Sequence, residues 1–156
     1  MLDEQVAHLA MQKEETAMSE HTKWMFTHLM EEVFNRGNFD AADAFVSPDF
    51  HNHEMSTDAL RVPEAFKSPA RRLRLAFPDL HAVLHEVVVE GDLAVGRIML
   101  SGTHQGEFMG VSGTGRSFSI QHIHMYRMTD GKIAEHWACR DDLGLLTQLG
   151  LMRPLT

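Results

Sequence analysis

The sequence predicts an α+β fold in which helices come first and a long antiparallel sheet follows. Apolar residues recur near a 3.6-residue period in the first half of the chain, which is typical of amphipathic helices. From residue 81 onward they alternate with a period of two, and short turns divide the pattern into strands. A curved sheet wrapped around helices forms a cone-shaped α+β barrel, whose open end is a natural concave, apolar pocket.

The N-terminal residues are more polar than the rest of the chain. Residues 3–17 carry only a weak apolar stripe, so we expect residues 1–18 to form a helical extension that packs on a partner chain. Ser19 is a good N-cap and predicts the start of a second helix, which carries Trp24 and ends at the turn 35–38. Residues 19–156 are expected to form a single domain, since this length suffices for one substantial core.

Three shorter elements precede the sheet: a helix at 39–46, an extended piece at 50–53, and a helix that begins at Val62-Pro63-Glu64 and runs to about residue 76. In the extended piece, alternate residues share a face, so His53 and Asn52 point in opposite directions. His53 either reaches the mouth of the pocket or lies on the surface. Asn52 reaches the pocket if the local turn points it inward.

Four strands are predicted at 81–89, 93–104, 117–128 and 132–141. In the third of them the even-numbered residues share one face, which holds Phe118, His122 and His124. A histidine on such a face is either a hydrogen-bonded core group or a contact to a ligand, and both interpretations stay open here.

The last strand carries a carboxylate where an apolar face ends. Ile133, Trp137 and Asp141 share this face, which is interrupted only by Glu135, whereas Asp142 is expected to point the other way. A carboxylate held partly out of water is a candidate base, because burial raises the pKa of an acid. Alternatively, Asp141 caps a helix that follows it.

Composition excludes several classes of protein. The net charge of −8 argues against nucleic acid or an anionic membrane as the main partner. One cysteine rules out an intramolecular disulfide framework. No apolar run is long enough to span a membrane and the first residues lack a hydrophobic signal core, so we expect a cytoplasmic protein.

Short motifs along residues 19–150 strongly resemble the SnoaL-like polyketide (ester) cyclase family of the nuclear-transport-factor-2-like superfamily. The motifs are Phe77-Pro78-Asp79-Leu80, the Gly-Thr-His at 102–104 with the loop to Gly110, Thr114-Gly115-Arg116, Asp130-Gly131-Lys132-Ile133, Glu135-His136-Trp137, and Leu143-Gly144-Leu145-Leu146 with Gln148-Leu149-Gly150. The resemblance implies a cone-shaped fold, a hydrophobic carbonyl-containing ligand, no cofactor, no metal, and a homodimer or higher oligomer formed through the outer face of the sheet.

The resemblance also implies site residues. Asp141 matches the aspartate that serves the family's cyclases as general acid and base, and His104 matches the family's Gly-Thr-His. His122 and His124 stand where many members have a small and a polar or acidic residue, so the pocket is expected to be richer in imidazoles. Those two histidines, with Trp137, Phe118, His53, Asn52 and Trp24, complete the expected substrate-binding set.

The implied reaction is an intramolecular aldol condensation, in which a base removes a proton from a carbon between carbonyls.

Three other functions stay open. One is a binding protein without catalysis, and another is an epoxide hydrolase-like enzyme, which needs a second inward acid beside Asp141. The third is a metal-dependent hydrolase that uses the His-x-His pairs at 51–53 and 122–124.

Overall fold

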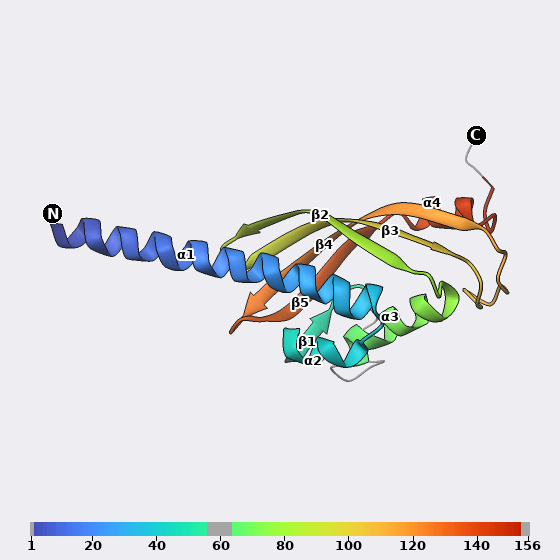
Figure 1. Cartoon of the computed structure of the whole chain (residues 1–156), viewed down its shortest axis with the longest axis horizontal. Coiled ribbons are helices and arrows are strands. Elements are labelled where there is room, and N and C mark those ends of the chain that lie inside the picture. The colour runs from blue at the N-terminus through green and yellow to red at the C-terminus, as the bar shows by residue number, and fades with distance from the viewer. Residues whose placement is uncertain (1, 56–63, 154–156) are drawn as a thin grey trace.

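The computed structural model describes residues 2–55 and 64–153 and has the expected α+β architecture, with helices on one side of a curved sheet (Figure 1). A π-helical turn at Met30–Asn35 prolongs the first helix, and a 3₁₀ turn at Phe39–Ala41 precedes the second. The helices are α1 (Leu2–Leu29), α2 (Ala42–Phe45), α3 (Glu64–Ala76) and α4 (Asp142–Gln148). The strands are β1 (Val46–Asn52), β2 (His81–Glu90), β3 (Leu93–Thr103), β4 (Ser117–Thr129) and β5 (Lys132–Arg140).

The five strands form one mixed sheet in the order β1-β5-β4-β3-β2. Strands β2 to β5 make the predicted antiparallel meander, and their limits lie close to those read from the alternating pattern. The extended piece expected at 50–53 is the end of a longer strand, β1, which pairs in parallel with β5. This pairing sets Asn52 opposite His136, next to the last strand of the meander.

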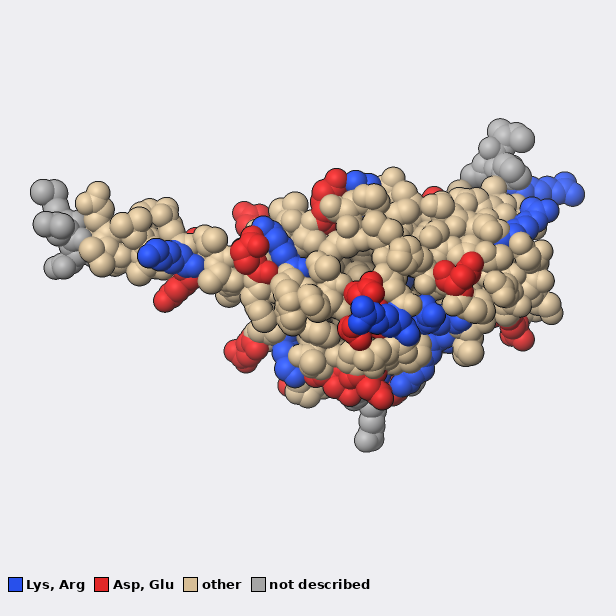
Figure 2. All heavy atoms as spheres, viewed as in Figure 1, with Lys and Arg blue, Asp and Glu red and all other residues tan. Residues whose placement is uncertain are grey.

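The first helix is one uninterrupted element. α1 passes through Ser19 without a break, so the prediction of a separate helix starting there is wrong. A serine caps a helix only where the preceding chain turns away, and the residues before Ser19 have good helix propensity. The first half of α1 stands clear of the body (Figures 1 and 2), and Val6 and Leu9 are 63% and 56% exposed. Within 2–55 and 64–153, no helix is both long and apolar enough to cross a membrane.

The second half of α1 packs on the inner face of the sheet. The ring of Phe26 is buried against Tyr126 of β4, with 4.9 Å between the ring centroids. The Phe26 ring fits against β3 because the strand has a glycine, Gly96, at the point of contact. A Cβ atom at Gly96 would lie 2.4 Å from the Phe26 ring, which is too close for any side chain. Leu29 and Val33 continue the same buried stripe, so this half of the helix belongs to the core.

Deleting residues 1–17 should change the stability of the body little and weaken self-association. The removed side chains that the structure describes are exposed, so the core loses no contact, and Ser19 then stands where it can cap the shortened helix. Thermal unfolding and light scattering measure the two effects. An unchanged molar mass contradicts the role in association, and a large fall in the melting temperature contradicts the independence of the body. Val6→Lys with Leu9→Lys tests the same contact in the full-length chain.

Candidate active site

The inner face of the sheet and α3 enclose an elongated cavity. One end has a volume of about 320 Å³ and the other about 240 Å³. The two ends adjoin each other, since they share Leu73 and Arg72 of α3 and Leu100, His122 and Arg140 of the sheet. Cavities of this size bind small organic molecules.

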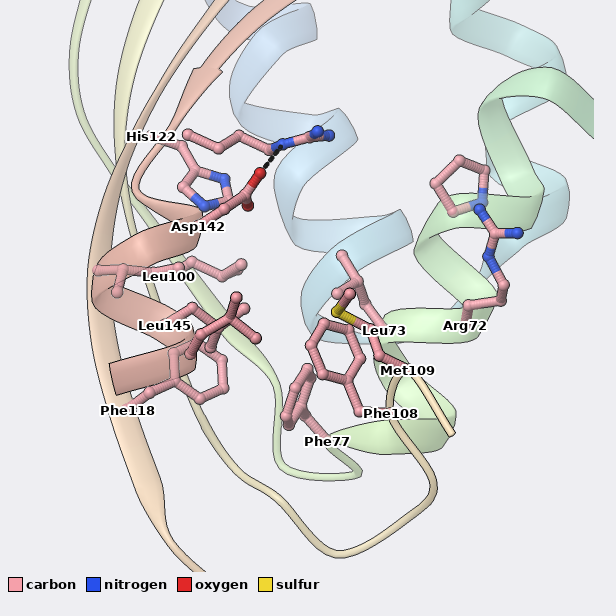
Figure 3. A pocket seen from close by; sticks show the side chains of 14 residues that line it. Arg72, Leu73, Phe77, Leu100, Phe108, Met109, Phe118, His122, Asp142 and Leu145 are labelled. Carbon is pink, nitrogen blue, oxygen red and sulfur yellow. Dashed lines mark ion pairs between the residues drawn. The ribbon is translucent and has the colours of Figure 1, made fainter. Parts of the chain in front are cut away.

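Apolar side chains make up most of the wall at the larger end. In Figure 3, three phenyl rings lie together at one side of the pocket, and His122 and Asp142 lie at the other. The rings belong to Phe77, Phe108 and Phe118, and Phe77 packs on the other two with centroid distances of 5.1 and 4.8 Å. A flat, apolar ligand fits such a wall, and a few polar groups at the far side can orient it.

His122 and Arg140 stand where the two ends of the cavity meet. They are directly opposite each other on β4 and β5, so their side chains share the inner face of the sheet. The Arg140 guanidinium lies 3.5 Å from the Asp142 carboxylate and 3.7 Å from that of Glu54. The cavity therefore has one imidazole and one permanent positive charge side by side at its centre.

A β-bulge decides which residues of β5 face the cavity. Ile133 pairs with Met128, but Glu135 pairs with Arg127, so Ala134 is an extra residue in β5. Beyond it the even-numbered residues turn inward, namely His136, Ala138 and Arg140. The predicted inward face of Ile133, Trp137 and Asp141 is therefore wrong beyond the bulge. Glu135 was the signal of this change, because an unbroken alternation would place that acid opposite the buried Tyr126.

The two neighbouring aspartates have the reverse of their expected placement. Both are exposed, but Asp142 lines the cavity and Asp141 does not line either end of it. The Asp141 carboxylate accepts a hydrogen bond from the backbone N–H of Gly144, 2.8 Å away, at the start of α4. A Cβ atom at residue 144 would lie 2.1 Å from this carboxylate, so only glycine permits the contact. The helix-capping interpretation of Asp141 is the one that the structure shows.

His104 also lies outside the cavity lining. Its side chain is fully buried, and its Nδ1 accepts hydrogen bonds from the backbone N–H and the hydroxyl of Thr114, at 3.3 and 3.1 Å. The ring packs behind Phe77 and Phe108, with centroid distances of 5.7 and 6.2 Å. His104 thus holds the loop that supports the phenyl wall and is not placed to touch a ligand.

Three residues of the expected binding set lie on the outside of the molecule. His53 stacks on Trp137, with 4.3 Å between centroids, and its Nε2 lies 2.8 Å from the Glu135 carboxylate. Trp24 is 49% exposed and packs on His28 of the same helix. Their placement in the pocket is therefore corrected. Asn52, His122, His124 and Phe118 do line the cavity, as expected.

Three histidines and one asparagine form a continuous hydrogen-bonded chain along the cavity wall. Asn52 Oδ1 lies 3.0 Å from His136 Nδ1, and His136 Nε2 lies 2.8 Å from His124 Nδ1. His124 Nε2 lies 3.4 Å from His122 Nδ1. Among the described residues, two buried side-chain nitrogens have no hydrogen-bond partner, the Nε2 of His122 in this chain and the Nε2 of His104 outside the cavity lining. His136 is a member that the sequence pattern missed, because the bulge reverses its direction.

These imidazoles are neutral at pH 7. Burial, and then the charge of Arg140, lowers the pKa of His122 to about 4 and that of His136 to about 4. Burial also holds the pKa of His124 well below its usual value, and the other two imidazoles lower it further. Within the described ranges, no three His, Cys, Asp or Glu side chains are arranged to hold a metal ion.

The stability of the fold should fall as the pH is lowered from about 6.5 to 4. In this range the unfolded chain binds protons at His122 and His136 that the folded protein does not, so acid favours unfolding. The loss is about 3 kcal/mol for each of these imidazoles. Urea unfolding at a series of pH values measures it. His136→Gln should flatten the dependence, His85→Gln controls for the loss of an exposed histidine, and an equal slope in all three proteins contradicts the assignment.

Comparison with a family model and with curated proteins identifies the family. Residues 25–149 match the model of the SnoaL-like polyketide cyclases. The aklanonic acid methyl ester cyclase DnrD of Streptomyces peucetius is 36% identical over 130 residues, which are 78% of this chain and 86% of that protein. The nogalonic acid methyl ester cyclase of Streptomyces nogalater is 34% identical over 124 residues, covering 78% and 92%. TsrD of Streptomyces laurentii has a similar structure, with a TM-score of 0.79 and 31% sequence identity. The match covers 85% of this chain and 97% of TsrD.

The cone of helices and sheet, its apolar cavity and these matches agree, and the chain belongs to the SnoaL-like polyketide cyclase family.

Proposed function

We propose that this protein closes a ring in a carbonyl-containing polyketide by an intramolecular aldol reaction that needs no cofactor. The observation that carries the proposal is the pairing of His122 with Arg140 at the centre of an apolar cavity. The buried Nε2 of His122 is free to take a proton, since no described residue bonds to it. Arg140 supplies a positive charge at the same place.

In the proposed reaction, His122 Nε2 removes a proton from a carbon between two carbonyls, and an enolate forms. The guanidinium of Arg140, whose side chain is 39% exposed, donates to the negative enolate oxygen and stabilises its charge. The enolate carbon then attacks a second carbonyl of the same molecule, forming a carbon–carbon bond and an alkoxide. The His122 imidazolium returns its proton to the alkoxide, so the product is an isomer of the substrate.

The low pKa of His122 is compatible with this role. The imidazole is neutral and ready to accept a proton at any pH well above 4. Once the enolate forms beside it, the opposite charge raises the pKa of the imidazolium, because the two ions attract strongly in a nonpolar site. General base catalysis of this kind contributes roughly 10²–10⁴-fold, and the fold-enforced conformation of the substrate contributes further.

The cavity and the relatives together indicate the substrate class. The two curated relatives are cyclases of aklanonic and nogalonic acid methyl esters. The phenyl wall at the larger end suits a flat ring system, and the polar centre suits a flexible carbonyl chain. We therefore infer an aromatic polyketide methyl ester as the class of substrate.

Replacing His122 should abolish most of the turnover, whereas replacing Asp141 should not. His122→Gln removes the base and should lower kcat by about 10²–10⁴-fold with little change in binding. Asp141→Asn keeps a good helix cap and should keep kcat within a few-fold. Conversion of aklanonic and nogalonic acid methyl esters, followed by chromatography, measures both.

If kcat falls greatly in Asp141→Asn and stays normal in His122→Gln, the base is Asp141. This result contradicts the assignment to His122. Tight binding of both esters without turnover by the unaltered protein supports the alternative of a binding protein. Asp142→Asn is the matched control on the cavity side. Its carboxylate lines the cavity and pairs with Arg140, so we expect a change in KM rather than loss of kcat.

We also propose that the outer face of the sheet associates with a second copy of the chain. Val88 of β2 and Ile123 of β4 lie on this face, 65% and 47% exposed, and Val95 of β3 pairs with both Val88 and Met125, so these side chains share the face. Apolar patches of this kind are typical of interaction surfaces. Ile123→Glu should lower the molar mass in light scattering without lowering the melting temperature, and an unaltered mass contradicts the interface.

A further inference from the structure

We propose that Asn52, through His136 and His124, is a positioning residue that holds His122 in the tautomer with a bare, unbonded Nε2. The inference deepens the proposed function and depends on His122 being the base. It assigns a role to residues on three different strands, β1, β4 and β5, which no motif of the sequence links.

The side-chain amide of Asn52 has a defined orientation. Its Oδ1 accepts a hydrogen bond from the backbone N–H of Glu54, 3.1 Å away, and its Nδ2 donates to the backbone carbonyl of Ala65, 3.4 Å away. Exchanging the two atoms would set donor against donor and acceptor against acceptor. The oxygen therefore points at His136, and because an oxygen of this kind only accepts, His136 Nδ1 must carry the hydrogen in their 3.0 Å bond.

The orientation then passes from ring to ring. A neutral imidazole has one N–H donor and one bare acceptor nitrogen, so a hydrogen on His136 Nδ1 leaves its Nε2 bare. That nitrogen accepts from His124 Nδ1 across 2.8 Å, which leaves His124 Nε2 bare. His124 Nε2 in turn accepts from His122 Nδ1 across 3.4 Å. The last nitrogen, His122 Nε2, is left with a lone pair that no described residue bonds.

The surroundings keep the chain in this single arrangement. Burial lowers the pKa of each of the three imidazoles, so each ring carries only one hydrogen at neutral pH. Tyr126 is fully buried beside the chain, with its ring centroid 5.1 Å from that of His136 and 6.3 Å from that of His124.

The chain also assists the base once it has reacted. When His122 Nε2 takes a proton, the ring becomes a cation whose Nδ1–H already points at the bare Nε2 of His124. A hydrogen bond from a charged donor is stronger than one from a neutral donor, so His124 stabilises the imidazolium. This is the part that a buried acceptor plays behind the histidine of a catalytic triad, here taken by a second imidazole.

The ring nitrogens of ¹⁵N-histidine-labelled protein report tautomers directly, because N–H and bare nitrogens have different chemical shifts in NMR. The unaltered protein should show Nδ1–H and bare Nε2 on His122, His124 and His136. A hydrogen on Nε2 of His122 at neutral pH overturns the inference without any variant. This measurement needs no substrate, so it is independent of the proposed reaction.

Two replacements of Asn52 then separate positioning from packing. Asn52→Leu has a similar size but no acceptor, so His136 and the rings beyond it should show mixed tautomers, and kcat should fall at least about tenfold with KM little changed. Asn52→Asp keeps the acceptor oxygen for His136 but sets its second oxygen against the Ala65 carbonyl, so it should restore the tautomers and part of kcat. Unchanged tautomers in Asn52→Leu overturn the inference, and equal losses in both variants show a structural role instead.

Failure of the proposed function has a different signature. If His122→Gln keeps full turnover while the tautomers respond to Asn52 as described, the base lies elsewhere and the hydrogen-bonded chain has no catalytic role. If His122→Gln is inactive but the tautomers are the same in the Asn52 variants as in the unaltered protein, His122 is the base and Asn52 has no positioning role. Should Asn52→Leu fail to fold, His136→Phe removes the next acceptor of the chain, the Nε2 that accepts from His124 Nδ1. The tautomer of His122 is then measured in that variant.

Discussion

The extra residue at Ala134 in β5 determines what the cavity contains. Side chains alternate along a strand, so one inserted residue reverses the direction of every side chain that follows it. Beyond Ala134 the strand turns His136 and Arg140 inward and Trp137 outward. The polar centre of the cavity, the hydrogen-bonded chain of imidazoles and the position of the helix cap all follow from this single irregularity.

The electrostatics of the site depend on how little water reaches it. Three imidazoles next to one another would repel if charged, and burial beside Arg140 keeps them neutral. Arg140 carries the lasting positive charge of this group, and the carboxylates of Glu54 and Asp142 lie 3.7 and 3.5 Å from it at the edge of the cavity. An enolate that forms inside the cavity would share the Arg140 guanidinium with these two carboxylates, next to neutral imidazoles.

Much of the fold could be predicted from the sequence, because its strands alternate regularly and its turns are standard. The limits of β2 to β5, the helix ending at Ala76 and the family all follow from local patterns. Pairing between distant segments could not be predicted in this way. Nothing local shows that β1 runs parallel to β5, and this pairing is what brings Asn52 to His136.

The candidate site was predictable only in part, for the same reason. The inward face of β4 is regular, so Phe118, His122 and His124 were placed correctly. On β5 the bulge displaced Asp141 and Trp137 from the expected face and brought in His136 and Arg140. Glu135, a charged residue in an otherwise apolar row, was the one local sign of the irregularity. His104 was misplaced because a buried histidine that supports a loop has the same sequence pattern as one that binds a ligand.

The cap formed by Asp141 and Gly144 ties the end of β5 directly to α4, so no linker absorbs a change in strand length. Loss of one residue between Ala134 and the cap would rotate the two adjacent aspartates by half a turn and exchange their environments. Evolution could therefore switch such a cavity between an imidazole base and a carboxylate base by a single-codon deletion, without altering either acid. Alignments of relatives that place a gap in this strand would mark where such a switch has occurred.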